Sequence, residues 1–385
     1  MLLPDMLTLR NMWRVMSTSG RDSAVAGSFF LSGAQLVFAA SGYLVNVGLA
    51  RILGPNAYGQ YGVTISILVW LEILLSMGLA TVTAKMAAES PESAKTITML
   101  TLHYVAALSI ILYGIAWVTA KPIGSLLLDE EIAVYLKIAA IDLLFFGVLK
   151  VLTVVNNGIR AYARASLITI TYAISKAALI LGLAASGFGV KGALLGNIGA
   201  TVFGLIIALF FMKQLQEQPI DRKRFLSVLK ISLPTTIWAI CIILLMSMDL
   251  WVAKAIVGGE KTGYYVAAMA LARLVYILST GARTIVLPEI SSRLARKGYR
   301  QARRSLARMT LIFLPAMLFS ILLLGLFSEQ LVRIVYSEVY SPAVPILRVL
   351  LVAYFAVTFC EFFSDALTAI GKATSNTLRI GTAGL

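Results

Sequence analysis

Charged side chains are scarce in this sequence, and so are the residues that usually build catalytic or metal centres. Only 13% of the 385 residues are charged, whereas soluble domains carry about a quarter. The two cysteines, Cys241 and Cys360, fall inside apolar runs, where packing is their usual role, so they do not indicate a redox compartment. The single histidine, His103, is interpreted as a packed or interfacial side chain. The sequence contains no Walker motif, metal-ligand cluster or nucleophile elbow, which argues against ATP hydrolysis and covalent catalysis.

Hydrophobic residues are abundant instead. They make up 59% of the chain, and the mean hydropathy is +0.88. Apolar runs of about 18 residues or more, long enough to cross a hydrocarbon core as helices, recur along the whole chain. The sequence therefore predicts an all-α, polytopic membrane protein without a separate soluble domain. An eleventh span is expected to begin near Asn376, after ten spans at 28–50, 61–83, 97–119, 136–156, 166–185, 192–212, 231–253, 264–286, 307–326 and 343–370.

Lys and Arg outnumber Asp and Glu by 33 to 18, which gives a formal net charge of +15. Such an excess can indicate a nucleic-acid partner, but in a membrane protein basic residues first mark the cytoplasmic side. We interpret it as a topology signal and expect no nucleic-acid partner. The predicted location is the cytoplasmic membrane, and the densest basic cluster, from Arg293 to Arg308, is expected to contact anionic lipids. The amino terminus is predicted in the cytoplasm, together with loops 89–95, 160–164, 213–230 and 291–304.

A glycine-rich motif occurs twice. "LARILGPNAYGQYGV" (residues 49–63) and "AKAIVGGEKTGYYV" (253–266) both place a basic residue and a glycine turn before a Gly-aromatic restart. A second match, at nearly the same offset, aligns residues 163–166 with 371–374. Equivalent helices lie six spans apart, an even number, so the two halves form a parallel repeat, which is a transporter architecture with substrate between the halves. The predicted parts are a basic leader (1–23), an N-terminal lobe of six helices (24–212), a cytoplasmic linker (213–224) and a C-terminal lobe (225–385).

The first motif, together with "MDLWVAKAIVGGEKTGYYVAAMALARLV" (248–275), resembles the polysaccharide-transport branch of the multidrug/oligosaccharidyl-lipid/polysaccharide exporter superfamily, the Wzx-type flippases. Asp249 also fits the pattern of that branch. The resemblance implies two pseudo-symmetric six-helix bundles around a central cavity and the translocation of a polyprenyl-diphosphate-linked oligosaccharide by alternating access. Against this pattern the second bundle is expected to be truncated, with about four and a half helices, because Leu385 aligns with the middle of the fifth span.

Polar and charged residues inside the predicted spans fall on narrow faces. Charges within a bilayer are costly, so they usually face protein or water. At about 100° per residue, one face of the fourth span collects six polar side chains. Similar faces occur on the second, eighth and tenth spans. These faces predict a hydrated cavity or, alternatively, buried polar contacts that hold helices together. They comprise Asp142, Lys150, Thr153, Asn157, Arg160 and Arg164; Glu72 and Ser76; Arg273, Tyr276, Thr280 and Arg283; and Thr358, Glu361, Asp365, Thr368 and Lys372.

Roles follow from the chemistry of a diphosphate-linked sugar, which needs cations for the phosphates and amide or hydroxyl partners for the sugars. Lys176, on the fifth span, is interpreted either as a snorkelling residue or as a further cavity cation. No cofactor is expected, although Asp249, Glu361 and Asp365 are the best candidates for Na⁺ or H⁺ coupling. The residues predicted to bind substrate are Lys150, Asn157, Arg160, Arg273 and Arg283. The residues predicted to couple ions or supply counter-charge are Glu72, Asp142, Asp249, Glu361 and Asp365.

Three alternatives remain at this point. A multidrug exporter of the same superfamily would favour a more acidic cavity, against which the arginines argue. A membrane glycosyltransferase or polymerase usually carries its catalytic residues in a large extracytoplasmic loop, and no loop here is long enough, so we expect no enzyme. A non-transporting member of a glycan assembly complex is the third. The expected partners are the lipid-linked oligosaccharide, membrane lipids and a polysaccharide polymerase or glycosyltransferase complex.

Overall fold

The computed structural model describes residues 23–220, 225, 228, 244 and 247–369, and all regular elements in these ranges are helical. Contacts divide the chain into a first unit, Met1–Thr262, and a second unit, Gly263–Leu385, which we describe separately. The division follows Thr262, so the helical residues 247–257 pack with the first unit. The predicted lobes, with their boundary at 213–224, express the sequence repeat and stay a prediction.

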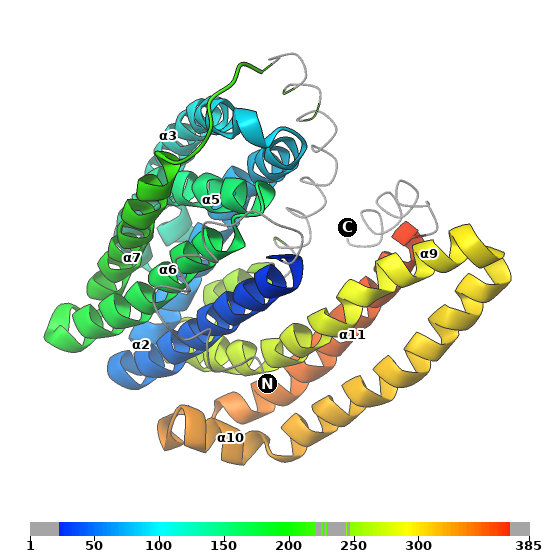
Figure 1. The fold of residues 1–385 in the computed structure, drawn as a ribbon. Helices are drawn as coiled ribbons and strands as arrows, with labels where there is room; N and C mark the ends of the chain where they lie inside the picture. Colours follow the sequence, from blue (N-terminus) through cyan, green and yellow to red (C-terminus); the bar gives the residue numbers. More distant parts are fainter. Residues whose placement is uncertain (1–22, 221–224, 226–227, 229–243, 245–246, 370–385) are drawn as a thin grey trace, which may run out of the picture. The chain divides into compact units, whose positions relative to one another are not determined.

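The first unit is a bundle of long apolar helices (Figure 1). A 3₁₀ turn, η2 (Pro91–Ser93), follows the first helix, and a π-helical turn, η3 (Ala184–Phe188), precedes the last. Residues 247–257 add a further helical segment, which we call the docked segment. The long helices are α2 (Ser23–Glu89), α3 (Ala94–Leu126), α4 (Glu130–Ala140), α5 (Leu143–Gly158), α6 (Tyr162–Leu183) and α7 (Gly189–Met212).

Helix α2 contains the first glycine motif and is broken there. Gly54 has φ +73° and ψ 172°, a left-handed conformation that glycine adopts without penalty. Pro55 follows directly, and a proline is tolerated where a helix starts again because its missing N–H would have no partner. The predicted break is therefore confirmed, but the helix resumes at Pro55 and not, as predicted, near Tyr61. The predicted spans 28–50 and 61–83 are the two arms of α2.

The number of separate helices differs from the number of predicted spans because several spans merge. Five helices of the described residues are long and apolar enough to cross a membrane, or six if the bent pair α4 and α5 forms one span. Two of the five, Phe29–Glu89 and Tyr162–Met212, each cover two predicted spans. Predicted span 231–253 and the start of the eleventh lie mostly or wholly outside the described residues. The chain is thus a multi-pass membrane protein.

Helices α6 and α7 approach each other closely, at a glycine. A Cβ added to Gly196 of α7 would lie 2.7 Å from backbone atoms of Ile180 on α6. Small residues at such crossings let the backbones of membrane helices meet. Beside this contact, α5, α6 and α7 share a hydrophobic core of Leu149, Leu152, Ile168, Tyr172, Ala200, Ala208 and Phe211.

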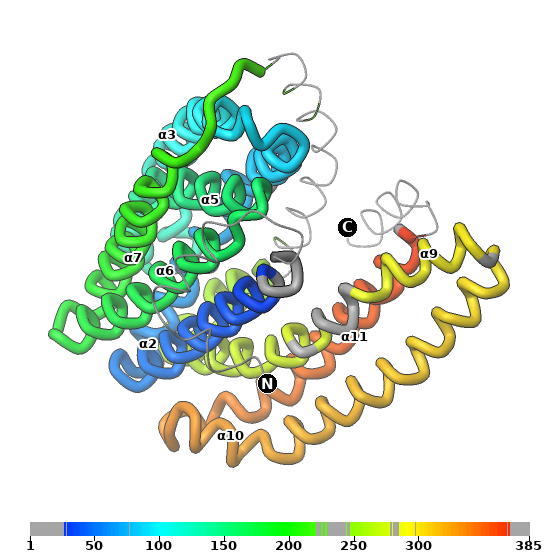
Figure 2. Tube along the Cα trace, viewed as in Figure 1, coloured from blue at the N-terminus to red at the C-terminus, as the bar shows by residue number. Residues whose placement is uncertain are grey.

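The second unit contains α9 (Gly259–Leu326), which begins at the end of the first unit, and then α10 (Ser328–Val335), the turn η4 (Glu338–Tyr340) and α11 (Ala343–Ala369). Helix α9 bends sharply at Gly298 (φ +74°), as its trace shows in Figure 2. Both sides of this bend are helical, so the prediction of a loop at 291–304 is wrong: the arginines lie on helix. Phe313 of α9 stacks on Phe362 of α11, with ring centroids 4.4 Å apart.

The two ends of helix α3 lie in different groups of polar contacts. Lys95, in the first turn of α3, forms an ion pair with Glu217, close to a core of Ala87, Ala94, Val155 and Leu215. At the other end of α3, about 50 Å away for a helix of this length, Gln60, Asp129 and Lys254 come together. The segments around Lys95 and Glu217, which were predicted to lie on the same side of the membrane, therefore lie at the same end of the first unit. Which end faces the cytoplasm stays a prediction.

Candidate functional site

Four charged residues of the first unit form what we call the charge cluster: Glu72, Asp142, Lys150 and Lys176. Glu72 lies on α2, Lys150 on α5 and Lys176 on α6, while Asp142 lies at the bend between α4 and α5. Glu72 is within electrostatic range of the other three. The sequence predicted that Glu72, Asp142 and Lys150 occupy polar faces of their helices, and the fold brings those faces together.

Asp142 is the most deeply buried member of the cluster. Its residue is fully buried, and neither carboxylate oxygen accepts a hydrogen bond of ordinary geometry from the described residues. Its backbone carbonyl accepts from the N–H groups of Phe145 and Phe146 and so begins α5. Thr201 and Asn197, both buried on α7, lie within electrostatic range of the carboxylate. The site therefore combines an acid with neutral polar partners, and sequence analysis had not singled out the two on α7.

Lys176 places a cation among these acids. Its Nζ lies 3.3 Å from the Tyr172 hydroxyl oxygen and 5.4 Å from the centroid of the same ring. Tyr61, Glu72 and Tyr172 all contribute to its electrostatic environment. Of the two interpretations from sequence, this packing favours the interior cation over the snorkelling one, because snorkelling requires a path to the interface.

The polar stripe predicted along the fourth span is interrupted in the structure. Helix α5 ends at Gly158, and α6 begins at Tyr162, so Arg160 lies in the turn between them. Arg160 has φ +61°, a left-handed conformation that is rare for a residue with a side chain. A single polar face requires one continuous helix, so the prediction is wrong for Arg160, in the turn, and Arg164, on α6. Lys150, Thr153 and Asn157 do lie on α5 at the spacing of one face.

The second-unit candidates lie on α9 and α11. Arg273 donates from Nε to the Tyr354 hydroxyl oxygen at 2.8 Å, which joins the two helices. Glu361 and Asp365 are half-buried, one turn apart on α11. The side chain of Arg283 lies outside the described residues. That Glu361 and Asp365 counter the cations of the first unit stays a prediction.

Asp249 lies in the docked segment, where it is half-buried and its Oδ1 accepts the backbone N–H of Leu250 at 2.8 Å. The described residues contain no group of three or more His, Cys, Asp and Glu side chains placed to hold a metal ion.

An ion pair at the docked segment was not predicted from the sequence. Lys254, 2% exposed, donates to Asp129 Oδ2 at 2.6 Å. Burial alone would raise the pKa of Asp129, but the bonds from Lys254 and Gln60 outweigh it and hold the pKa below its usual value. Lys254 was noted only as the basic residue of the second glycine motif, so no partner 125 residues away was predicted.

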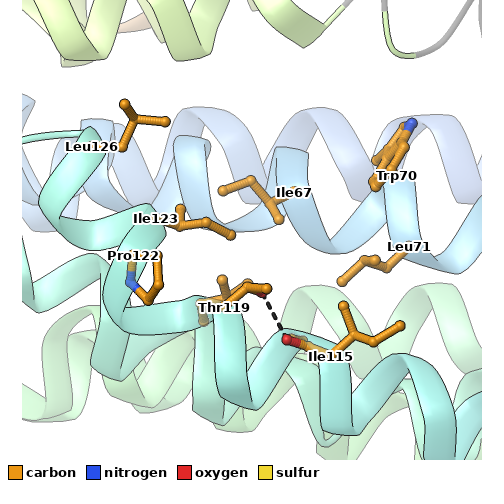
Figure 3. A pocket seen from close by; sticks show the side chains of 10 residues that line it. Ile67, Trp70, Leu71, Ile115, Thr119, Pro122, Ile123 and Leu126 are labelled. Carbon is orange, nitrogen blue, oxygen red and sulfur yellow. Dashed lines mark hydrogen bonds between the residues drawn. The ribbon is translucent and has the colours of Figure 1, made fainter.

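One pocket of the first unit is almost wholly apolar. It has a volume of about 370 Å³ and lies between α2 and α3, with Ile67, Trp70 and Leu71 on one side and Ile115, Thr119 and Ile123 on the other (Figure 3). The Thr119 hydroxyl donates to the Ile115 carbonyl at 2.7 Å, so this hydroxyl already has a hydrogen-bond partner within its own helix. The lining contains no charged residue, and the pocket is therefore unsuited to a diphosphate.

The sequence matches a family described as "Polysaccharide biosynthesis protein" over residues 48–345, more than half of the chain. The chain belongs to this polysaccharide biosynthesis protein family. The match includes the whole of both glycine motifs, so the resemblance derived from them is confirmed. A search of curated proteins returned no significant match.

Solved structures with the same fold are transporters. An inward-facing multidrug resistance MATE family transporter of the MOP superfamily aligns with a TM-score of 0.71 and 17% identity, covering 89% of this chain and 83% of the other. A MOP superfamily transporter from Pyrococcus furiosus, described as having a binding pocket of reverse polarity, aligns at 0.63 and 18%, covering 95% and 86%. An outward-facing MATE transporter aligns at 0.59 and 17%, also covering 95% and 86%. This member of the polysaccharide biosynthesis family therefore has the all-α, two-bundle MATE-like fold that the sequence predicted.

Proposed function

We propose that the protein is a flippase that moves a polyprenyl-diphosphate-linked oligosaccharide across the cytoplasmic membrane by alternating access, with its amino terminus in the cytoplasm. Membership of the polysaccharide biosynthesis family is the observation that carries this proposal, because it names the class of product. The transporter fold supports translocation as the step that the protein performs. A polymerase or glycosyltransferase complex is the partner that would supply or consume such a substrate.

The substrate would be held by residues that can meet phosphate and sugar. We assign the diphosphate to Lys150, Arg160, Arg273 and Arg283, because charge-assisted hydrogen bonds from cations are the strongest that a phosphate accepts. Asn157 lies on the same face of α5 as Lys150, and its side-chain amide can form hydrogen bonds with the sugars. The side chains of Lys150 and Arg160 are both exposed rather than packed in the core.

The acids near these cations would determine how favourable substrate binding is, because they compete with the diphosphate for the cations. Glu72 attracts Lys150 in the structure, and an entering diphosphate competes with it for the cation. Glu72 and Asp142, two acids close together, are also suited to exchange a proton or Na⁺ when the charge of the site changes. Asp249, Glu361 and Asp365 have the same proposed role at positions outside the charge cluster.

A multidrug exporter is the second candidate, and the fold favours it as much as it favours a flippase. The acids Glu72 and Asp142 lie together in one unit, and an acidic site suits organic cations. Lys150 and Lys176, both within range of Glu72, reduce that suitability because they repel a cationic drug.

Reconstitution into proteoliposomes separates the two candidates. One set of vesicles receives a fluorescent polyprenyl-diphosphate oligosaccharide, and movement is measured as the fraction protected from an external reagent. A matched set measures the efflux of a fluorescent organic cation under a proton or Na⁺ gradient. Flipping of the oligosaccharide without cation efflux supports our proposal, whereas cation efflux without flipping contradicts it.

A further inference from the structure

The docked segment is attached to the first unit by two side chains three residues apart, which places them on one helical face. Lys254 reaches Asp129 at 2.6 Å. Trp251 donates from Nε1 to Ser66 Oγ at 2.7 Å and meets the Trp70 ring edge-on, with centroids 6.4 Å apart. The segment thus contacts both the second arm of α2 and the connection between α3 and α4.

The surroundings of Lys254 are built to hold a cation. Asp129 Oδ2 accepts from Gln60 Nε2 at 3.0 Å as well as from Lys254, and Asp129 Oδ1 accepts the Glu131 backbone N–H that begins α4. Gln60 also donates to Glu131 Oε2 at 2.8 Å, and Tyr135 donates to the same oxygen at 3.3 Å. Lys254 therefore faces a carboxylate that two other donors, Gln60 and the Glu131 N–H, hold in place.

Burial makes this ion pair different from the Lys95–Glu217 pair, which also belongs to the first unit. Lys254 and Asp129 side chains are 2% and 13% exposed, whereas those of Lys95 and Glu217 are 33% and 64% exposed. An exposed pair contributes little, but a buried charge that loses its partner destabilises its surroundings strongly. The docked segment can therefore separate from α2 and from the α3–α4 connection only if the charges of Lys254 and Asp129 become hydrated at the same time.

The chain immediately after this segment is a joint. Gly258 and Gly259 have φ +58° and +42°, left-handed conformations that glycine adopts freely. A Cβ at Gly258 would meet nothing within 4 Å, so no side chain packs at this position, and the Gly258 N–H donates to the Lys254 carbonyl at 3.2 Å. Helix α9 starts at Gly259, and after Thr262 the chain belongs to the second unit. The docked segment is thus followed at once by two glycines at which the helix is interrupted.

We propose that Lys254 and Asp129 form a gate latch, which holds one end of the transport pathway closed and opens when the docked segment leaves the first unit. The Gly258–Gly259 joint lets α9 change direction as this happens. The predicted topology places the latch on the extracytoplasmic side, opposite the Lys95–Glu217 pair. The inference rests on the proposed alternating access, but it concerns residues that no substrate needs to touch.

Thiol labelling from outside tests the latch without substrate. The reporter is Thr262→Cys, a fully buried position just after the joint, in a chain with Cys241→Ser and Cys360→Ser. An impermeant maleimide is added to right-side-out vesicles, and labelling is normalised to the total after SDS denaturation. We expect Lys254→Gln and Asp129→Asn to raise the labelling rate at least about tenfold, because each leaves a buried charge unpaired. Lys254→Arg should stay near the parental rate.

Two further variants separate the latch from general loosening. Lys95→Gln breaks the exposed pair at the other end and should leave labelling within about twofold of the parent, because exposed pairs contribute little. The exchange Lys254→Asp with Asp129→Lys should restore most of the protection. Asp129→Asn keeps the shape and the cap of α4, so it remains a test if Lys254→Gln does not fold.

Parental labelling rates in folded Asp129→Asn overturn the latch, and so does an equal rise in Lys95→Gln. Because labelling needs no substrate, a chain that fails to flip oligosaccharide but shows latch-dependent labelling contradicts the proposed substrate and leaves the latch standing.

Discussion

Replacing Lys176 by methionine removes the cation that the two acids of the charge cluster share. Lys176 contacts Tyr172 and lies within electrostatic range of Glu72 and Asp142. Removing one partner of a buried charge pair costs about 3–5 kcal/mol. We expect a loss near the lower end, about 3 kcal/mol in the free energy of unfolding, because Glu72 is only half-buried and water can replace part of the lost attraction.

The assay is equilibrium unfolding of the purified protein in SDS. Lys137→Met is the matched control. Lys137 Nζ lies 4.8 Å from the centroid of the Trp117 ring, a contact worth about 0.5–1 kcal/mol, and Lys137 is not among the charges that act on Glu72 and Asp142. The double variant Lys176→Met with Glu72→Gln should recover at least half of the loss, since it removes the uncompensated acid. A loss in Lys176→Met no larger than in Lys137→Met would refute the shared-cation reasoning.

The remaining predictions concern backbone strain, packing and pH. Gly196→Ala should lower the free energy of unfolding by about 1–3 kcal/mol because its Cβ would press on the α6 backbone, whereas Gly182→Ala, with open space around it, should raise the free energy by about 0.5–1 kcal/mol; both are measured by SDS unfolding. Arg160→Gly should stabilise by about 1 kcal/mol by relieving a left-handed residue, yet slow transport if Arg160 binds substrate; unchanged stability would show that the turn is unstrained. The stability difference between the parent and Asp129→Asn should be constant from about pH 8 to 5 and shrink below about pH 4, because the lowered pKa of Asp129, beside Lys254, Gln60 and Glu131, stabilises only while it is ionised. A difference that changes near neutral pH would contradict this.

The fold class and most helices could be predicted from sequence because they depend on local composition. Gly54 followed by Pro55 ends and restarts a helix in any context, so the break in α2 was predictable. The bend of α9 was misjudged because a run of arginines resembles a loop, whereas arginine is a good helix former and only Gly298 interrupts the helix. The merging of spans across such breaks explains why fewer separate helices occur than predicted spans.

The candidate site was less predictable because it depends on contacts between distant segments. The faces of α2 and α5 that carry Glu72 and Lys150 followed from periodicity, but the stripe failed at Arg160, where one left-handed residue ends the helical register. Asn197 and Thr201 are isolated polar residues in the apolar helix α7, and only their four-residue spacing could have marked them. Lys254 is the basic residue of a glycine motif, and Asp129 caps the start of a helix. Each position is explained by its own neighbours in the sequence, so nothing in the sequence links the two residues.

The most direct test of the proposed substrate site is whether Lys150 holds the diphosphate. The measurement is the initial rate at which proteoliposomes flip a labelled polyprenyl-diphosphate oligosaccharide, with parent, Lys150→Ala and the control Lys137→Ala at equal amounts of folded, inserted protein. We predict that Lys150→Ala raises the substrate concentration for half-maximal rate by about ten- to a hundredfold, as expected for losing a charge-assisted contact of about 1.5–3 kcal/mol. Lys137→Ala should flip at the parental rate. A parental rate and half-maximal concentration in Lys150→Ala would contradict the account.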